Sequence, residues 1–152
     1  MICLNRSVLD FMDSVLTPES FVLEFGAGGS TEWFLHRCEW LTTIETKKEW
    51  ADKCVHDGMC LAEDPGAISL SHLWEKMDLV LIDGEAKFRN TFSRKAWATL
   101  KRGGWLVFDD AQRPQHANAV AWLSTFAEPV RLEWSTGDVE SAKERLALAW
   151  QK

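Results

Sequence analysis

The stretch that decides the fold is Phe21-Val-Leu-Glu-Phe-Gly-Ala-Gly-Gly-Ser-Thr31. Residues 22–25, apolar except for Glu24, form the short run that a buried parallel strand requires. Three glycines follow, and Ser30 or Thr31 is expected to cap an amphipathic helix over residues 32–38. Glycine lets the backbone turn sharply and approach a ligand without an intervening Cβ. The stretch therefore predicts a strand, a glycine turn and a helix around a nucleotide-like ligand.

The spacing of these glycines differs from that of dinucleotide-binding proteins, which carry a third glycine three residues after the second. Thr31 stands at that position here. The run Glu24-Phe-Gly-Ala-Gly28 instead resembles the first motif of the Rossmann-like S-adenosylmethionine (SAM) dependent methyltransferases. The later pattern of Ile82-Asp-Gly84, Gly103-Gly104 and Asp109-Asp-Ala-Gln-Arg113 resembles small bacterial members of unassigned substrate. The first resemblance implies that the glycine stretch holds the methionine end of the cofactor. The cofactor-binding residues expected here are Glu24, Gly26, Ala27, Gly28, Ser30 and Thr31. A glycine turn that merely closes a strand–helix connection is the alternative.

Two further acidic positions complete the expected cofactor site. Glu45 ends the β-rich run that begins at Trp40, 17 residues beyond Gly28, where a carboxylate can accept both ribose hydroxyls. An exposed charge at a strand end is the alternative for Glu45. After the short third strand, the resemblance implies an acidic contact to the adenine amino group, from Asp64 or from Glu63. A solvated turn explains these two residues equally well.

Carboxylates also follow the fourth and fifth predicted strands. Asp83 follows the continuously apolar run 79–82, and Asp109 follows the run 105–108, so both emerge at the edge where open α/β sheets bind ligands. The resemblance places Asp83 near the cofactor's methionine and the methyl acceptor. We expect Asp83, Asp109 and His116 to be the catalytic residues, because a base is needed for a hydroxyl or protonated amine acceptor. His116, early in a helix, is equally consistent with a surface residue.

A more specific hypothesis is that this site holds a divalent metal ion. Catechol-type O-methyltransferases hold Mg²⁺ with an Asp after the fourth strand and an Asp-Asn pair after the fifth. Asp83, Asp109 and Asp110 occupy matching places, and hard oxygen ligands suit Mg²⁺ or Ca²⁺. However, Asp110 replaces the Asn, and Ala86 stands where that family has a lysine. We therefore expect no metal ligands, although a divalent cation stays an alternative.

The remaining pattern predicts helices on both faces of a sheet. Helical spacing marks residues 1–16, 47–56 and 88–100, with Gly103-Gly104 as the stop of the third helix, and Pro114 opens another. Strand-like runs at 129–134 and 145–150 are joined by the polar stretch 135–144. The resemblance implies a Rossmann-like, mostly parallel sheet of seven strands in the order 3-2-1-4-5-7-6, with strand 7 antiparallel. Residues 1–152 are expected to form a single domain.

Composition narrows the class of protein. The chain has 152 residues and a net charge of −6, which disfavours a nucleic-acid partner because phosphate backbones are repelled. Lys87, Arg89, Arg94 and Lys95 are interpreted as a solvated helix surface, with substrate binding as the alternative. The four cysteines match no zinc spacing and are expected to be buried free thiols. No apolar run spans a membrane and no signal peptide is recognised, so a cytoplasmic protein is expected.

These patterns together predict a SAM-dependent methyltransferase that moves a methyl group to a hydroxyl or amine of a small molecule. The expected partner is that small-molecule acceptor, with no nucleic acid and no membrane; the acceptor's identity and the oligomeric state stay open. Two alternatives belong to other classes of protein. The first is a non-catalytic module that binds SAM or S-adenosylhomocysteine (SAH), and the second is an NAD-dependent oxidoreductase.

Overall fold

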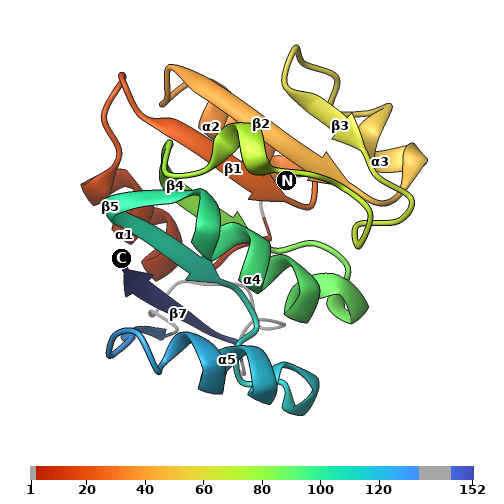
Figure 1. The fold of residues 1–152 in the computed structure, drawn as a ribbon. Coiled ribbons are helices and arrows are strands. Elements are labelled where there is room, and N and C mark those ends of the chain that lie inside the picture. The colour runs from red at the N-terminus through yellow and green to blue at the C-terminus, as the bar shows by residue number, and fades with distance from the viewer. Residues whose placement is uncertain (1–2, 134–144) are drawn as a thin grey trace.

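One mixed sheet of seven strands, in the order β3-β2-β1-β4-β5-β7-β6, forms the centre of the computed structural model, which describes residues 3–133 and 145–152 (Figure 1). β7 runs antiparallel to both of its neighbours, β5 and β6, and the pairs among β1 to β5 are parallel. The expected strand order is therefore confirmed. The strands are β1 (Phe21–Phe25), β2 (Trp40–Glu45), β3 (Met59–Leu61), β4 (Met77–Ile82), β5 (Leu100–Phe108), β6 (Val130–Glu133) and β7 (Leu146–Gln151). The helices are α1 (Arg6–Val15), α2 (Gly29–Leu35), α3 (Lys48–Ala51), α4 (Arg89–Thr99) and α5 (Ala117–Leu123).

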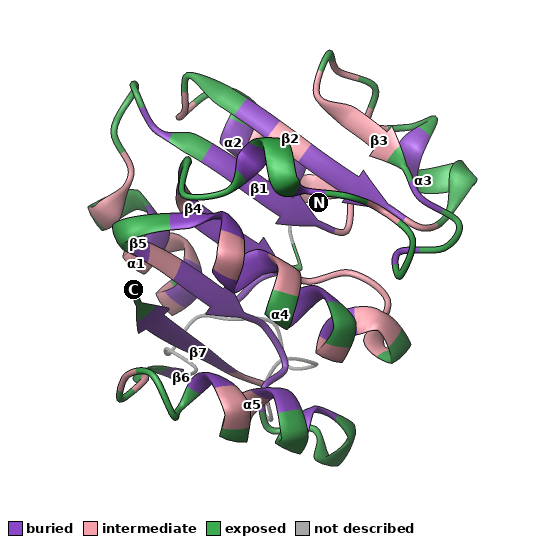
Figure 2. Cartoon of the chain, in the orientation of Figure 1, coloured by how far each residue is buried: buried purple, intermediate pink, exposed green. Residues whose placement is uncertain are grey.

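Two apolar layers cover the two faces of the sheet, because neighbouring side chains along a strand point to opposite faces. On β4, Leu79 and Leu81 pack with α1 and α2, whereas Val80 and Ile82 pack with α4 and α5. The central strands are almost wholly buried, as Figure 2 shows. Helices on both faces leave the carboxyl ends of the parallel strands as the edge at which a ligand can bind.

The helix after the glycine turn begins earlier than expected. α2 starts at Gly29, so Ser30 and Thr31 lie in its first turn instead of capping it. The Thr31 hydroxyl still serves the helix end, because its oxygen accepts the Gly28 N–H at 2.9 Å. The sequence pattern missed this start because the first turn carries no apolar side chain.

Two other helix predictions are wrong in extent. The helix expected over residues 47–56 is only the single turn α3, and Trp50 and Val55 are exposed, so no apolar face exists to extend it. The predicted glycine stop at Gly103-Gly104 lies within β5, which follows α4 directly. The chain becomes a strand at Leu100 because Leu100 pairs with Met77 and Lys101 forms an ion pair with Asp78.

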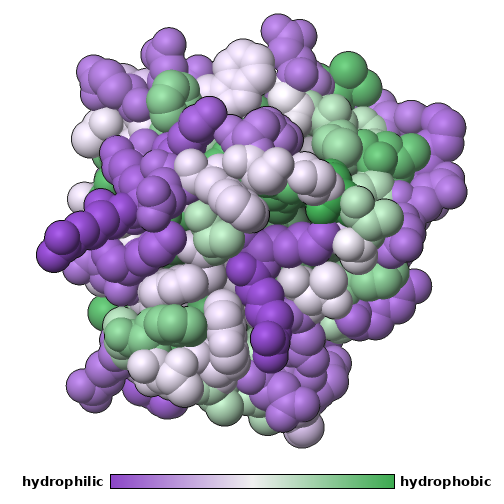
Figure 3. All heavy atoms as spheres, viewed as in Figure 1, coloured by the Kyte–Doolittle hydropathy of each residue, from purple (hydrophilic) through white to green (hydrophobic). Residues whose placement is uncertain are grey.

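Polar and apolar side chains are interspersed on the face of the molecule that Figure 3 shows. On the face shown in Figure 3, hydrophilic side chains separate the apolar areas from one another. The four cysteines are free thiols; Cys3 is exposed and the other three are half-buried, so they are less buried than expected. Among the residues that the structure describes, no helix is long and apolar enough to cross a bilayer. The predicted linker 135–144 lies outside the described residues.

Candidate functional site

The glycine turn joins β1 to α2 and packs against the turn after β4. Gly26 has a φ of +102°, and its N–H donates to the Ile44 carbonyl at 2.9 Å. A Cβ on Gly26 would lie 2.5 Å from the Gly84 Cα, closer than any side chain can approach. Only glycine fits this position, because it alone tolerates both the left-handed backbone and the close contact. The two turns are thus held together at the carboxyl edge of the sheet.

A cavity of about 300 Å³ opens at this edge. Its walls include the glycine turn from Gly26 to Ser30, the strand ends at Glu45 and Asp83, and the chain segment at Cys3 and Leu4. Lys47, Trp50, Gly84 and Glu85 complete the lining. The cavity thus brings together six of the residues expected to bind a cofactor, Gly26, Ala27, Gly28, Ser30, Glu45 and Asp83, from three separate strand ends.

Glu24 lies behind the cavity wall and is completely buried. Its carboxylate accepts hydrogen bonds from the hydroxyls of Ser30 at 2.5 Å, Thr31 at 2.8 Å and Thr43 at 3.1 Å. Burial raises the pKa of Glu24 to about 7, although the three hydroxyl donors oppose this rise. Glu24 and Thr31 therefore support the turn from beneath, and Ser30 is the member of this group that reaches the cavity.

Glu45 connects the end of β2 to the glycine turn. Its Oε2 accepts the Ala27 N–H at 2.7 Å, and its Oε1 accepts the N–H groups of Thr46 at 2.6 Å and Lys47 at 2.7 Å. The side chain is nearly buried but borders the cavity. Because each carboxylate oxygen has two lone pairs, Glu45 retains acceptor capacity toward a ligand hydroxyl.

Asp64 lies apart from this cavity. It is exposed in the turn after β3, where its Oδ1 accepts the Gly66 N–H at 2.9 Å. Glu63 is exposed as well, and neither side chain belongs to the cavity lining. Both residues therefore lie in a solvated turn, which was the alternative to an adenine contact.

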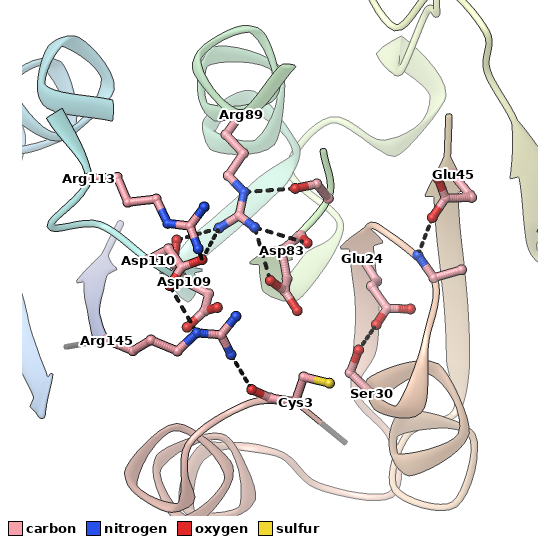
Figure 4. A network of polar contacts seen from close by, with 12 residues as sticks. Cys3, Glu24, Ser30, Glu45, Asp83, Arg89, Asp109, Asp110, Arg113 and Arg145 are labelled. Atoms are coloured by element: carbon pink, nitrogen blue, oxygen red, sulfur yellow. Dashed lines mark hydrogen bonds and ion pairs between the residues drawn. The ribbon is translucent and has the colours of Figure 1, made fainter. Parts of the chain in front are cut away.

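An arginine that the sequence analysis assigned to a solvated surface connects the ends of β4 and β5. Arg89 is buried, and its guanidinium donates to the carbonyls of Gly84 at 2.8 Å and Asp109 at 2.6 Å and to the Asp83 carboxylate at 3.2 Å (Figure 4). The interpretation of Arg89 as part of a solvated surface is wrong. The signal was its spacing, because Arg89 precedes Phe92 by three residues and so shares the buried side of α4.

The carboxyl groups of Asp83 and Asp109 lie at the border between this arginine and the cavity. Asp83 lines the cavity, whereas Asp109 is fully buried and neither of its carboxyl oxygens has a hydrogen-bond partner among the described residues. Burial, together with the negative charges of Asp83 and Asp110, raises the pKa of Asp109 well above its ordinary value. Burial also raises the pKa of Asp83, against the opposing Arg89 charge. Asp83 is thus the carboxyl group that a ligand in the cavity would meet.

Asp110 is neutralised by arginines. Its carboxylate forms ion pairs with Arg113 at 2.7 Å and with Arg145 at 3.1 Å, and Arg145 also donates to the Cys3 carbonyl. Figure 4 shows the three arginines gathered around the three aspartates, with Glu24 and Ser30 to one side. Within the described part of the chain, no group of three acidic, His or Cys side chains is arranged to hold a metal ion. The catechol-type metal arrangement therefore does not fit these residues as they are placed.

His116 is part of the core and does not line the cavity. Its ring meets Phe108 edge-on at a centroid distance of 5.3 Å, and neither ring nitrogen has a hydrogen-bond partner among the described residues. Burial and the charge of Arg89 lower its pKa. His116 therefore does not share the cavity that Asp83 lines, and the alternative interpretation as a surface residue is wrong.

Comparison with known proteins supports the fold. No protein-family model and no curated protein matches the sequence. N-methyltransferase NodS from Bradyrhizobium japonicum, in complex with SAH, is 20% identical, with a TM-score of 0.63 over 97% of this chain and 85% of that chain. An rRNA methylase from Streptococcus thermophilus is 16% identical, with a TM-score of 0.72 over 100% and 98% of the two chains. A precorrin 8w decarboxylase from Methanobacterium thermoautotrophicum is 15% identical, with a TM-score of 0.70 over 96% and 88%.

Similarity to structures that are at most 20% identical establishes the fold alone. The reaction has to be argued from the site, because one fold supports different chemistries. The strand order, the antiparallel β7 and the glycine turn after β1 agree with the resemblance found in the sequence. The chain therefore has the fold of the Rossmann-like SAM-dependent methyltransferases.

Proposed function

We propose that this protein is a SAM-dependent methyltransferase acting on a small-molecule hydroxyl or amine. The observation that carries the proposal is the cavity at the carboxyl edge of the sheet, where the glycine turn, Glu45 and Asp83 meet. A cofactor with a ribose, a methionine end and a positive sulfonium matches such a lining, since Glu45, Asp83 and Glu85 face it with Lys47 as the opposing charge.

Each wall of the cavity has a role in this proposal. The backbone from Gly26 to Ser30 holds the methionine end, and Glu45 accepts one ribose hydroxyl with the remaining lone pair of its Oε2. Glu24 and Thr31 act from beneath by fixing Ser30 and the turn. Asp64 is not brought to the cavity by this structure, so the adenine contact is not assigned to it.

The reaction requires alignment more than covalent work by the protein. SAM supplies the methyl group on a sulfonium that leaves as the neutral sulfide. Residues around the cavity hold the acceptor in line with that methyl group, which accounts for much of the rate of such reactions. Asp83 receives the proton that the hydroxyl or amine releases, and burial keeps its pKa above that of an exposed aspartate. Arg89 fixes the Asp83 carboxylate, and Asp109 lies behind it.

A small acceptor is favoured over RNA by charge. The chain carries −6 overall, and carboxylates outnumber cations on the cavity wall. RNA-binding surfaces instead need basic residues to replace the counterions of the phosphates. The solved rRNA methylase shares only the fold with this chain, so it does not decide the acceptor.

Calorimetric titration with SAM, SAH and NAD tests the cofactor. We expect SAM and SAH to bind and NAD not to bind; NAD binding alone would support the oxidoreductase instead. Turnover with a panel of small hydroxyl and amine acceptors, followed by SAH release, then tests catalysis. SAM binding with no turnover on any acceptor would favour the non-catalytic binding module.

Asp83→Asn tests the proposed base. The substitution should retain SAM binding and reduce turnover by at least about a hundredfold, the usual contribution of a general base. Asp64→Asn, in the exposed turn, is the matched control and should leave both quantities unchanged. Full activity of Asp83→Asn would remove Asp83 from the mechanism.

A further inference from the structure

A chain of hydrogen bonds extends from the wall of the proposed cofactor cavity to a second cavity on the other side of β2. Ser30 lines the first cavity and donates to Glu24, which also accepts from Thr43. The Thr43 oxygen lies 3.0 Å from Nε2 of His56, and His56 borders the second cavity. A buried acid is therefore connected to the cofactor cavity through one side chain.

Neighbouring backbone N–H groups determine the direction of the hydrogen bonds that link His56, Thr43 and Glu24. Nδ1 of His56 accepts the Gly58 N–H at 3.2 Å, so Nε2 carries the hydrogen of the neutral ring and donates to Thr43. Thr43 therefore uses its own hydrogen to donate to Glu24. Thr31 is constrained in the same way, because its oxygen accepts the Gly28 N–H while its hydrogen goes to Glu24. Both threonines are fixed as donors to the carboxylate.

Ser30 is the hydroxyl that is free to reverse. Its oxygen makes no hydrogen bond other than that to Glu24 among the described contacts, and it faces the cavity. When Glu24 is ionised, the Ser30 hydrogen points inward and its lone pairs face the cavity. When Glu24 carries a proton, that proton occupies the short contact to Ser30, and the Ser30 hydrogen turns outward. The ionisation of Glu24 thus determines the polarity that Ser30 presents to a ligand.

We propose that Glu24 is a positioning residue whose ionisation, transmitted by Ser30, makes the cavity discriminate the cationic sulfonium of SAM from the neutral sulfide of SAH. This inference rests on the proposed function. In the ionised state, the buried negative charge and the outward lone pairs of Ser30 both favour a cation. In the protonated state, both contributions are lost, so the preference for SAM over SAH falls.

The groups around Glu24 allow this titration near neutral pH. Burial raises the pKa of Glu24 to about 7, and the negative charge of Glu45 adds to the rise. The thiols of Cys38 and Cys54 have pKa values raised by burial and by Glu24 itself, so they stay neutral. Burial lowers the pKa of His56, so its ring gives up its proton at a lower pH than an ordinary histidine. Among Glu24 and the groups around it, Glu24 is thus the one expected to change charge as the pH passes 7.

The test is the ratio of SAM to SAH affinity, measured by calorimetric titration of the full chain between pH 5.5 and pH 8.5. We expect this ratio to rise by about tenfold as the pH increases through 7, the order expected for one charge near the cavity. Both ligands carry the same amino and carboxylate groups, so their ratio isolates the charge at sulfur. Asp83 also borders this cavity and has a raised pKa, so Glu24→Gln should strongly reduce the dependence and leave only the part that Asp83 contributes. Ser30→Ala should weaken it.

Glu32→Gln is the matched control, because Glu32 is an exposed carboxylate in the same first turn of α2. It should leave the pH dependence as in the unmodified chain. A ratio that does not vary with pH in the unmodified chain, or that varies as strongly in Glu24→Gln as in the unmodified chain, would overturn the inference while leaving the proposed function intact. If neither SAM nor SAH binds at any pH, the proposed function fails and this inference with it. A ratio that stays constant over this pH range in the unmodified chain overturns the inference even if a variant does not fold.

Discussion

Two glycines in the same turn should respond in opposite ways to substitution. A Cβ on Gly26 would lie 2.5 Å from the Gly84 Cα and 2.6 Å from the Gly84 nitrogen, both of them backbone atoms. A Cβ on Gly28 would meet no atom within 4 Å, and the Gly28 φ of 174° is ordinary extended backbone. Gly26 therefore serves the fold, whereas the space beside Gly28 serves the proposed ligand.

The expected magnitudes follow from these contacts. Gly26→Ala adds about 1–2 kcal/mol for a left-handed alanine and about 1–3 kcal/mol for overpacking, so we expect about 2–5 kcal/mol of destabilisation. For a chain of this size, that lowers Tm by about 4–20 °C. Gly28→Val should change stability by no more than about 0.5 kcal/mol, as at other open positions. It should weaken SAM binding by about tenfold or more, because its side chain fills space that the ligand needs.

Scanning calorimetry measures Tm, and titration calorimetry measures SAM affinity. Gly103→Ala is the control for backbone strain alone, since Gly103 has a φ of +84° and its Cβ would meet no atom within 4 Å. It should lose only about 1–2 kcal/mol and bind SAM normally. A Gly28→Val protein that melts as low as Gly26→Ala, or that binds SAM with unchanged affinity, would refute this assignment of the two glycines.

Three other substitutions test the remaining residues. Glu45→Gln should reduce SAM affinity by about 10- to 100-fold in a titration, the scale of a lost charged hydrogen bond; an effect on Tm alone would support a purely structural role. Glu24 has a pKa of about 7 in the folded chain against 4.5 when unperturbed, so its contribution to stability is full below pH 4.5 and declines as the pH rises through 7. Compared with Glu24→Gln, the unmodified chain should therefore lose about 3 kcal/mol of unfolding free energy between pH 4.5 and pH 8. Denaturant unfolding at several pH values measures this, and an equal dependence of the unfolding free energy on pH in the two proteins would contradict it. His116→Phe should keep full turnover and should not lower Tm, because both ring nitrogens lack partners in the core; a large loss of turnover with the fold intact would restore a catalytic role.

The order of the sheet was expected from the resemblance to the methyltransferases, whereas the central strands could be located because each carries its own signal. Residues 79–82 are continuously apolar, as only a strand covered on both faces can be, and Asp83 follows at the point where the strand leaves the core. Glu45 and the glycine turn end their strands in the same way, so parallel pairing alone brings the three strand ends to one edge. The cofactor cavity was thus foreseeable from local pattern. The extents of α3 and β5 were not, because the exposure of Trp50 and Val55 and the pairing of Leu100 with Met77 depend on residues outside any sequence window.

What the sequence determined by itself is therefore the line of strand ends at which Gly26, Glu45 and Asp83 meet, since buried strands and tight turns leave few residue types to choose from. Only the tertiary structure decided the role of each polar side chain. Glu24 lies on the side of β1 opposite Leu23 and Phe25, and it became a buried acceptor because α2 closes over it with Ser30 and Thr31. The same holds for Arg89, which is enclosed between two strand ends. Burial and partners, which set a side chain's charge and reach, come from residues distant in sequence.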